Sequence, residues 1–402
     1  MEIIEQWSID RPIAYARNAR KISDKAIDKI AASIKEFGWQ QPIVVDREGV
    51  IIVGHTRLLA ARKLQLTAVP VHVAEKLTDA QVKAYRLMDN RSHQETEWDF
   101  DLLAPELTEL QDMSVDLSLT GFDAAEIDKL LEPESIAGLT DEDQAPEVAE
   151  QAITLPGDIW ILGNHRLMCG DSVVLADVER LMAGSKADLV FTDPPYNVDY
   201  TGYTKEKLKI QSDKMTTEEF VAFLQGTFAS YRVVIKPGAS MYVCHPSSFQ
   251  REFQNAIESA GFSVRAQIIW AKNTFAWGFG RYKFQHEPIF YCHVEGESDA
   301  WYGDKTQSTL WQEKKPAANR LHPTMKPVEL IERALRNSSK AGDRVVDLFG
   351  GSGSTMIACE KTGRESSLME LDPKYADVIV KRWQDFTGKK AIHEETGKEF
   401  GQ

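Results

Sequence analysis

The chain has 402 residues, of which 43% are apolar and 27% charged, so it is long enough for two or three domains with at least one large core. No apolar run approaches the roughly 20 residues that cross a bilayer, and no leader pattern opens the sequence, which predicts a globular cytoplasmic protein without a membrane partner. The four cysteines are widely spaced without a C-x-x-C pair, which argues against a disulfide framework and a zinc site and favours reduced, mostly buried thiols.

The net charge of −14 is concentrated in one segment. Residues 1–91 carry 15 basic and 11 acidic side chains, residues 92–150 carry 1 and 18, and residues 151–402 carry 31 and 32. Phosphate repels the acidic segment, so we expect it to be a solvated spacer that stays away from nucleic acid. The nearly neutral C-terminal part can still present a basic cleft.

Residues 1–76 have the pattern of a small α+β unit. Ser23 is a good helix N-cap, and apolar residues then recur at helical spacing until Gly38, which predicts an amphipathic helix. The further elements expected here are strands at 42–46, 51–53 and 69–74 and a helix at 55–64.

The remaining chain divides into four expected segments. Residues 77–131 continue as an acidic helical extension, and residues 132–151, where the periodicity ends, are expected to be a linker. In residues 152–390 apolar runs alternate with helical segments, which predicts an α/β domain with a doubly wound parallel sheet, followed by a tail at 391–402. The strands expected in this domain are 187–192, 239–244, 265–270, 288–293, 344–346 and 365–370, and the helices are 217–234, 247–260, 327–340 and 354–361.

Two short motifs, 154 residues apart, each follow one of these apolar runs directly. The glycines of the second motif, 347–353, let the backbone turn tightly against a ligand, and the helix after them offers free N–H groups. Glu370 ends the next strand, 23 residues after Asp347, where a carboxylate can accept both hydroxyls of a ribose. Because the carboxyl ends of parallel strands share one edge of a sheet, we expect the two motifs to meet there.

The first motif, Asp193-Pro194-Pro195-Tyr196, has the residue types needed to methylate an exocyclic amine. Such an amine is a poor nucleophile, and Asp193 with the Pro194 carbonyl can draw its two hydrogens while the prolines stiffen the loop. A target base must also leave the duplex stack, and Tyr196 offers an aromatic face to hold it.

The two motifs resemble those of the amino-methylating DNA methyltransferases, in which a catalytic D-P-P-Y precedes F-x-G-x-G in the permuted β group. The resemblance covers about 155–387 and includes matches at 157–160, 170–172, 322–327 and 370–375. It implies a Rossmann-like methyltransferase sheet, S-adenosylmethionine as cofactor, DNA as substrate and no metal. The catalytic residues that it implies are Asp193, Pro194, Pro195 and Tyr196. Its cofactor residues would be Asp171, Thr324, Lys326, Asp347, Phe349, Gly351, Gly353, Ser354 and Glu370.

By this resemblance the cofactor residues have separate expected places. Asp347 and Phe349 would border the methionine and adenine parts of the cofactor, and Glu370 would hold the ribose. Asp171 would lie near the adenine. Thr324 and Lys326 would border the amino-acid end, with His322 nearby as either a ligand neighbour or a structural residue.

The target base is predicted from what the sequence excludes. A C5-cytosine enzyme needs a nucleophilic cysteine after a proline, and none of the four cysteines follows one. Within the resembling family, aspartate at the head of the catalytic motif favours N6 of adenine, and serine favours N4 of cytosine. We therefore predict a DNA adenine-N6 methyltransferase, with an N4-cytosine enzyme, an RNA or protein methylase and a non-catalytic DNA-binding regulator as alternatives.

Contacts to DNA are expected where aromatic and basic residues interleave after the strand at 265–270. Tyr203 and the lysines after the catalytic loop have the composition of a DNA-facing flap or of solvated charge. The recognition sequence, a homodimer and an accompanying restriction enzyme all remain open. The predicted DNA-binding residues are Lys272, Trp277, Arg281, Tyr282 and Lys283, and the flap lysines are Lys205, Lys207 and Lys209.

The N-terminal unit resembles the ParB N-terminal, sulfiredoxin-like fold across about 9–74. Segments 34–38 and 41–45 match, and segment 54–61 stands where that family has an arginine-rich, phosphate-contacting helix start. Arg57 is the only arginine in that segment, which disfavours nucleotide hydrolysis. No cysteine precedes Cys169, which excludes a sulfiredoxin-type reductase. The resemblance implies an accessory module that binds DNA, a nucleotide or a protein partner, or one that is purely structural.

Overall fold

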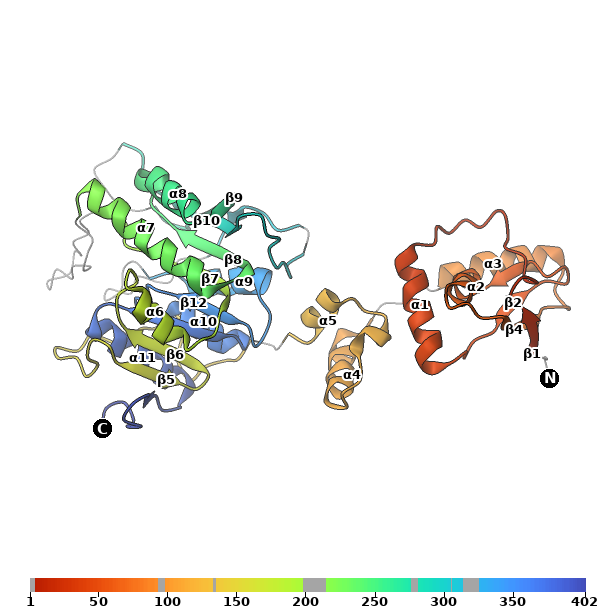
Figure 1. The fold of residues 1–402 in the computed structure, drawn as a ribbon, viewed down its shortest axis with the longest axis horizontal. Helices are drawn as coiled ribbons and strands as arrows, with labels where there is room; N and C mark the ends of the chain where they lie inside the picture. The colour runs from red at the N-terminus through yellow and green to blue at the C-terminus, as the bar shows by residue number, and fades with distance from the viewer. Residues whose placement is uncertain are drawn as a thin grey trace. The chain divides into compact units, whose positions relative to one another are not determined.

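The computed structural model describes residues 4–92, 98–132, 135–197, 215–275, 281–304, 306–313 and 325–402. The chain forms two compact units, residues 1–131 and residues 132–402 (Figure 1). No helix among the described residues is long and apolar enough to cross a membrane. The four cysteines are buried and free, as the sequence predicts.

The first unit begins with the α+β pattern that the sequence predicts. Its described residues form a four-stranded sheet in the order β1-β4-β2-β3, with β2 parallel to β4 and the other pairs antiparallel. The Ser23 side chain caps α1 by accepting a hydrogen bond from the Ala26 N–H at 3.2 Å. The elements are β1 (Ile4–Ser8), α1 (Asp24–Phe37), β2 (Ile43–Val45), β3 (Ile51–Val53), α2 (His55–Lys63) and β4 (Ala68–Val73).

The acidic extension that follows is helical, as predicted, and part of it contacts α1. Asp123, the N-cap of α5, forms ion pairs with both Lys25 and Lys29 of α1, and Lys29 also donates to the Gly121 carbonyl at 2.5 Å. Within the first unit, these contacts join the helical extension to α1 of the α+β part. Its elements are α3 (Asp79–Ser92), α4 (Phe100–Asp112), the 3₁₀ helix η1 (Leu117–Thr120) and α5 (Ala124–Leu130).

In the described part of the second unit, ten strands form one sheet in the order β11-β9-β10-β8-β7-β12-β13-β6-β5-β14. The adjacent pairs from β8 to β6 are parallel, which agrees with the predicted doubly wound sheet, whereas β10 runs antiparallel to β8 and β9. The strands are β5 (Ile159–Leu162), β6 (His165–Cys169), β7 (Ala187–Thr192), β8 (Ile235–Cys244), β9 (Phe262–Ala271), β10 (His286–Val294), β11 (Leu310–Trp311), β12 (Arg344–Asp347), β13 (Glu365–Glu370) and β14 (Ile392–His393).

Helices cover both faces of this sheet, and each face has its own apolar core. One core joins β7, β8 and β12 to α6, α7 and α8, and the cores of the other face join the sheet to α9, α10 and α11 (Figure 1). This two-sided burial explains why the central strands read as continuous apolar runs in the sequence. The helices are α6 (Leu175–Met182), α7 (Thr217–Val234), α8 (Gln250–Ser259), α9 (Val328–Ser338), α10 (Ser354–Thr362) and α11 (Pro373–Thr387), with a 3₁₀ turn η2 (Ser247–Phe249).

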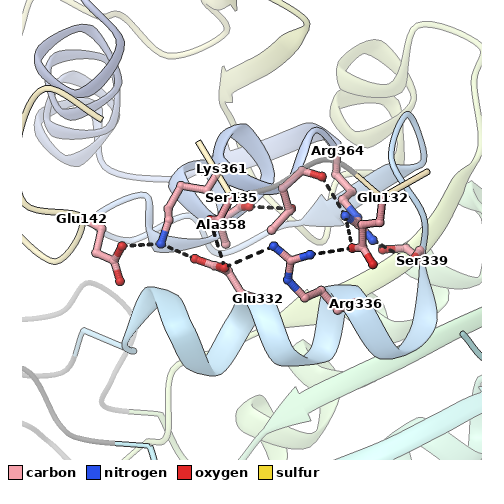
Figure 2. Close-up of polar contacts among 10 residues, drawn as sticks. Glu132, Ser135, Glu142, Glu332, Arg336, Ser339, Ala358, Lys361 and Arg364 are labelled. Atoms are coloured by element: carbon pink, nitrogen blue, oxygen red, sulfur yellow. Dashed lines mark hydrogen bonds and ion pairs between the residues drawn. The ribbon is translucent and has the colours of Figure 1, made fainter. Parts of the chain in front are cut away.

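The first part of the predicted linker is a docked arm, which we define as residues 132 and 135–145. The Glu132 carboxylate pairs with Arg364 at 2.7 Å and Arg336 at 2.9 Å, and Lys361 bridges Glu142 and Glu332 (Figure 2). Its described residues contain no helix or strand, in keeping with the lost periodicity, but these ion pairs join the arm to α9 and to α10 and its C-terminal end.

The docked arm also reaches the start of α9 and the face of α11. Asp143 accepts a hydrogen bond from the Val328 N–H at 3.0 Å, at the N-terminus of α9, and Arg382 donates to the Glu142 carbonyl at 2.6 Å. Gly138 lies so close to the Phe386 ring that an added Cβ would come within 2.1 Å of it. At the other end of the unit, the tail adds β14 antiparallel to β5.

Candidate active site

The two motifs meet at the carboxyl edge of the sheet. Strands β7 and β12 are parallel neighbours, with Val190 opposite Val346. Asp193, which follows β7, and Asp347, which ends β12, therefore lie at the same edge of the sheet. The Thr192 hydroxyl donates to the Asp347 carboxylate at 3.1 Å and joins the two strand ends directly. The expected meeting of the two motifs is therefore confirmed.

Asp347 is buried, and the chain itself satisfies both of its oxygens. One oxygen accepts from Thr192 and from the Phe349 N–H at 3.1 Å, and the other accepts from the Thr355 hydroxyl at 2.7 Å. Burial raises the pKa of Asp347 to about 7. These bonds fix the first turn of the glycine loop.

The glycine loop needs glycine at several positions. Gly351 and Gly353 have φ angles of 54° and 88°, in the left-handed region, and Gly353 is the N-cap of α10. A Cβ on Gly350 would lie 2.8 Å from Ile379 Cδ1, because this turn packs against α11. Gly351 is exposed, so its backbone stays open to a ligand.

Glu370 ends β13 beside the glycine loop. One carboxylate oxygen accepts from the Gly351 N–H at 2.8 Å and the other from the Asp372 N–H at 3.0 Å. Burial raises the pKa of Glu370 to about 7. Each oxygen keeps a lone pair with which it can accept a further hydrogen bond, so the carboxylate can bind two neighbouring hydroxyls.

The other predicted cofactor residues surround this edge. Asp171 follows β6, the neighbour of β13, and accepts from the Val173 N–H at 3.1 Å. The Phe349 ring makes an edge contact with Phe223 of α7, with ring centroids 5.8 Å apart. Ser354 is buried at the start of α10, where its hydroxyl accepts from Arg382 at 3.3 Å.

The predicted catalytic loop, residues 193–196, is held by contacts to both oxygens of Asp193. The Tyr196 hydroxyl donates to Oδ1 at 2.7 Å, and the Lys326 ammonium donates to Oδ2 at 2.6 Å. Burial, together with the negative charge of Asp193, raises the pKa of Tyr196, so its hydroxyl remains a donor. Pro194 is buried and Pro195 is partly buried, which is consistent with a stiff loop.

Lys326 contacts the catalytic loop directly, a contact that the sequence did not predict. Besides Asp193, its ammonium lies 3.2 Å from the Glu287 carboxylate of β10, and its side chain is only 6% exposed. Burial alone would lower the pKa of Lys326, but Asp193 and Glu287 outweigh this and raise it. Glu287 is therefore a site residue that the sequence prediction missed.

Tyr231 of α7 is a second missed residue. Its buried hydroxyl donates to Thr192 Oγ1 at 2.7 Å and accepts from the Leu348 N–H at 2.8 Å. It therefore ties the end of β7 to the start of the glycine loop. The sequence showed Tyr231 only as an apolar position of a helix.

The predicted DNA-binding residues lie in different environments. Lys272 is only 12% exposed, forms an ion pair with Glu287 and lies over the Trp270 ring, so it belongs to the site and not to an open basic surface. Tyr282 is 93% exposed, and Arg281 and Lys283 are also exposed. Seven residues named from the sequence lie outside the described residues: Trp277, His322, Thr324, Tyr203, Lys205, Lys207 and Lys209.

Comparison with known families gives matches along most of the chain. A DNA methylase family, that of the N6/N4 methyltransferases, matches residues 187–381, which include both motifs and Glu370. Residues 187–381 of the chain belong to this family. The methylase also matches the ParB N-terminal domain at 5–91 and the ParB-methyltransferase HTH domain at 101–156. The sequence-based recognition of both parts is confirmed.

Individual relatives resemble different parts of the methylase. The type II methyltransferase M2.LlaDCHI of Lactococcus lactis subsp. cremoris is 26% identical over 225 residues, which cover 48% of this chain and 81% of that protein. The ParB-like nuclease domain-containing protein YnaK of Escherichia coli K12 is 46% identical over 67 residues, or 17% of this chain and 77% of that protein. The crystal structure of the M1.HpyAVI–SAM complex is 22% identical, covers 54% of this chain and 97% of its own, and has a TM-score of 0.43.

Family membership establishes DNA methylation but not the target base, because the family includes enzymes that act on N6 of adenine and on N4 of cytosine. The family uses S-adenosylmethionine, in agreement with the predicted cofactor. Placement of the chain in the permuted β group stays a prediction, as do the roles of the individual site residues.

Proposed function

We propose that the methylase transfers a methyl group from S-adenosylmethionine to N6 of adenine in DNA. The observation that carries this proposal is the position of Asp193, which follows β7 directly and lies beside Asp347 and the glycine loop. An aspartate at this position, in place of a serine, favours adenine over cytosine within the family. The position brings an acceptor for the target amine next to the expected cofactor site.

The residues at the edge of the sheet fit a nucleoside cofactor. Gly351 presents an exposed backbone without a Cβ, and Glu370 beside it can accept two ribose hydroxyls. The N-terminus of α10 at Ser354 offers backbone N–H groups and the positive end of the helix dipole. When bound, S-adenosylmethionine supplies a methyl group on a sulfonium sulfur, and the new N–C bond forms as the C–S bond breaks with its electron pair left on sulfur.

Asp193 has the central part in the reaction. One oxygen accepts an N–H of the target amine while the Pro194 carbonyl accepts the other, which exposes the nitrogen lone pair. The nitrogen loses one proton after methylation, and Asp193 can pass this proton to solvent. Tyr196 releases Asp193 Oδ1 and offers its ring to the extruded base.

The test is to identify the modified nucleoside. The purified chain and Asp193→Asn are incubated with unmethylated DNA, RNA and protein and with isotopically labelled S-adenosylmethionine, and DNA hydrolysates are analysed by mass spectrometry. We expect N6-methyldeoxyadenosine from the wild-type chain and a loss of at least about 100-fold in the variant. Detection of N4-methyldeoxycytidine instead would show that the target is N4 of cytosine and not N6 of adenine. Label found only in RNA or protein would refute DNA methylation altogether.

We further propose that the ParB-like unit is an accessory module that binds DNA or a nucleotide. A cavity of about 540 Å³ lies beside its sheet, and its lining includes the basic residues Arg17, Arg47, Lys83 and Arg86. The acidic lining residues Asp46, Glu48 and Asp79 make a mixed site. The test measures the equilibrium binding of labelled nucleoside triphosphates and of short duplex DNA to the wild-type chain and to Lys83→Glu. At least one of these ligands should bind the variant more weakly, and unchanged affinity for both would refute the proposal.

A further inference from the structure

Four charged side chains form one cluster directly beside the catalytic loop. Lys326 lies between the Asp193 carboxylate at 2.6 Å and the Glu287 carboxylate at 3.2 Å, and Glu287 also forms an ion pair with Lys272. Two carboxylates and two ammonium groups make this cluster neutral. Lys326 and Lys272 are 6% and 12% exposed, so water screens these charges weakly.

Glu287 reaches the cluster through strand pairing. It lies near the start of β10, opposite Trp270 of β9, and Lys272 follows the end of β9. Burial alone would raise the pKa of Glu287, but Lys326 and Lys272 outweigh it and hold the pKa at about 2. Glu287 therefore stays ionised under all ordinary conditions and is the carboxylate shared by the two lysines.

We infer that Glu287 is a positioning residue that balances the two lysines, so that Asp193 keeps one oxygen for the target amine and the site carries no excess positive charge. This inference rests on the proposed methyl transfer. In the structure Lys326 holds only Oδ2, and Oδ1 contacts the neutral Tyr196 hydroxyl, which a substrate amine can replace.

Removing the charge of Glu287 has two consequences. Asp193 becomes the single carboxylate of the cluster, and both ammonium groups then compete for the oxygen that the amine needs. The cluster also gains a net positive charge beside Asp193, which contacts the reacting amine in the proposed reaction. The positively charged sulfonium of the methyl donor must approach the same place, so the added charge repels it. S-adenosylmethionine carries a positive charge on its sulfur, and its product S-adenosylhomocysteine does not. The ratio of their affinities therefore reports the electrostatic potential at the sulfur.

The first test therefore compares two ligands as well as rates. In Glu287→Gln we expect methyl transfer to fall on the order of 10- to 100-fold. We expect the affinity for S-adenosylmethionine, relative to S-adenosylhomocysteine, to fall about three- to tenfold. Glu295→Gln is the matched control, because Glu295 is an exposed glutamate just beyond the far end of β10, and it should change neither quantity.

The lysine partner supplies a rescue that a merely structural role does not predict. Lys272→Met removes the surplus cation, so the double variant Glu287→Gln/Lys272→Met should recover much of the rate and the wild-type affinity ratio. Lys272→Met alone should shift the ratio in the opposite direction, toward S-adenosylmethionine, and it remains informative if Glu287→Gln does not fold. Thermal unfolding of every variant verifies the fold.

The outcomes separate this inference from the proposed function. If the wild-type chain transfers no methyl group to DNA, the proposed function fails, but the affinity ratio in the variants still decides the role of Glu287. The charge-balance role is refuted if Glu287→Gln changes neither the rate of methyl transfer nor the affinity ratio of the two ligands. It is also refuted if adding Lys272→Met to Glu287→Gln makes these defects larger. In both cases the proposed methyl transfer stands.

Discussion

The raised pKa of Glu370 predicts how cofactor binding depends on pH. The carboxylate accepts backbone N–H groups from Gly351 at 2.8 Å and Asp372 at 3.0 Å, and burial raises its pKa to about 7. Ribose hydroxyls donate to the ionised form, so binding should weaken as pH falls through this value. With a pKa of about 7 the ionised fraction is roughly one tenth at pH 6 and nine tenths at pH 8, which predicts a Kd about tenfold higher at the lower pH.

Isothermal titration calorimetry with S-adenosylhomocysteine measures this dependence directly. Glu370→Gln is the comparison, because it keeps the size of the side chain and cannot ionise. Subtracting its pH profile removes contributions from the ligand's own amino group and from Asp347, whose pKa is also about 7. A wild-type Kd that does not change with pH, or a Glu370→Gln variant with the same pH profile, would refute the ribose role of Glu370.

Three further variants test the packing and the catalytic loop. Gly350→Ala places a Cβ 2.8 Å from a side-chain carbon of α11 and should lower the free energy of unfolding by about 1–3 kcal/mol, measured by urea denaturation, whereas Gly238→Ala meets its nearest neighbour at 3.4 Å and should lower it less. Gly138→Ala brings a Cβ within 2.1 Å of the Phe386 ring and should release the docked arm, so limited proteolysis should cleave it faster than in wild type; equal rates would contradict its docking. Tyr196→Phe keeps the aromatic face and should retain DNA KM within about threefold, whereas Tyr196→Ala should raise it about tenfold or more, and equal effects of the two would exclude stacking.

Much of the site could be predicted because its segments sit at strand ends. Strands that are buried on both faces read as apolar runs, and the residue that follows each run lies at a known edge of the sheet. Asp193, Asp347 and Glu370 were found in this way, and the structure places all three at this edge. The boundaries of β7 and β13 agree with the sequence prediction to the residue.

The missed features depend on contacts between distant parts of the chain. Glu287 reaches Asp193 only because β10 runs antiparallel between β8 and β9, and no local pattern in the sequence encodes that pairing. Lys326 was expected to border the cofactor, and its ion pair with Asp193, 133 residues earlier in the chain, is a further contact that no local pattern indicates. The docked arm has no periodicity, and its ion pairs with α9 and α10 appear only in three dimensions.

The most direct test of the central claim, that Asp193 activates an adenine amine beside the glycine loop, is base-resolved mapping of methylated DNA. DNA from cells that express the chain should contain N6-methyladenine at defined sites, and DNA from cells that express Asp193→Asn at the same level should lack it. Equal N6-methyladenine in both samples, or methylation confined to cytosine, would contradict the account.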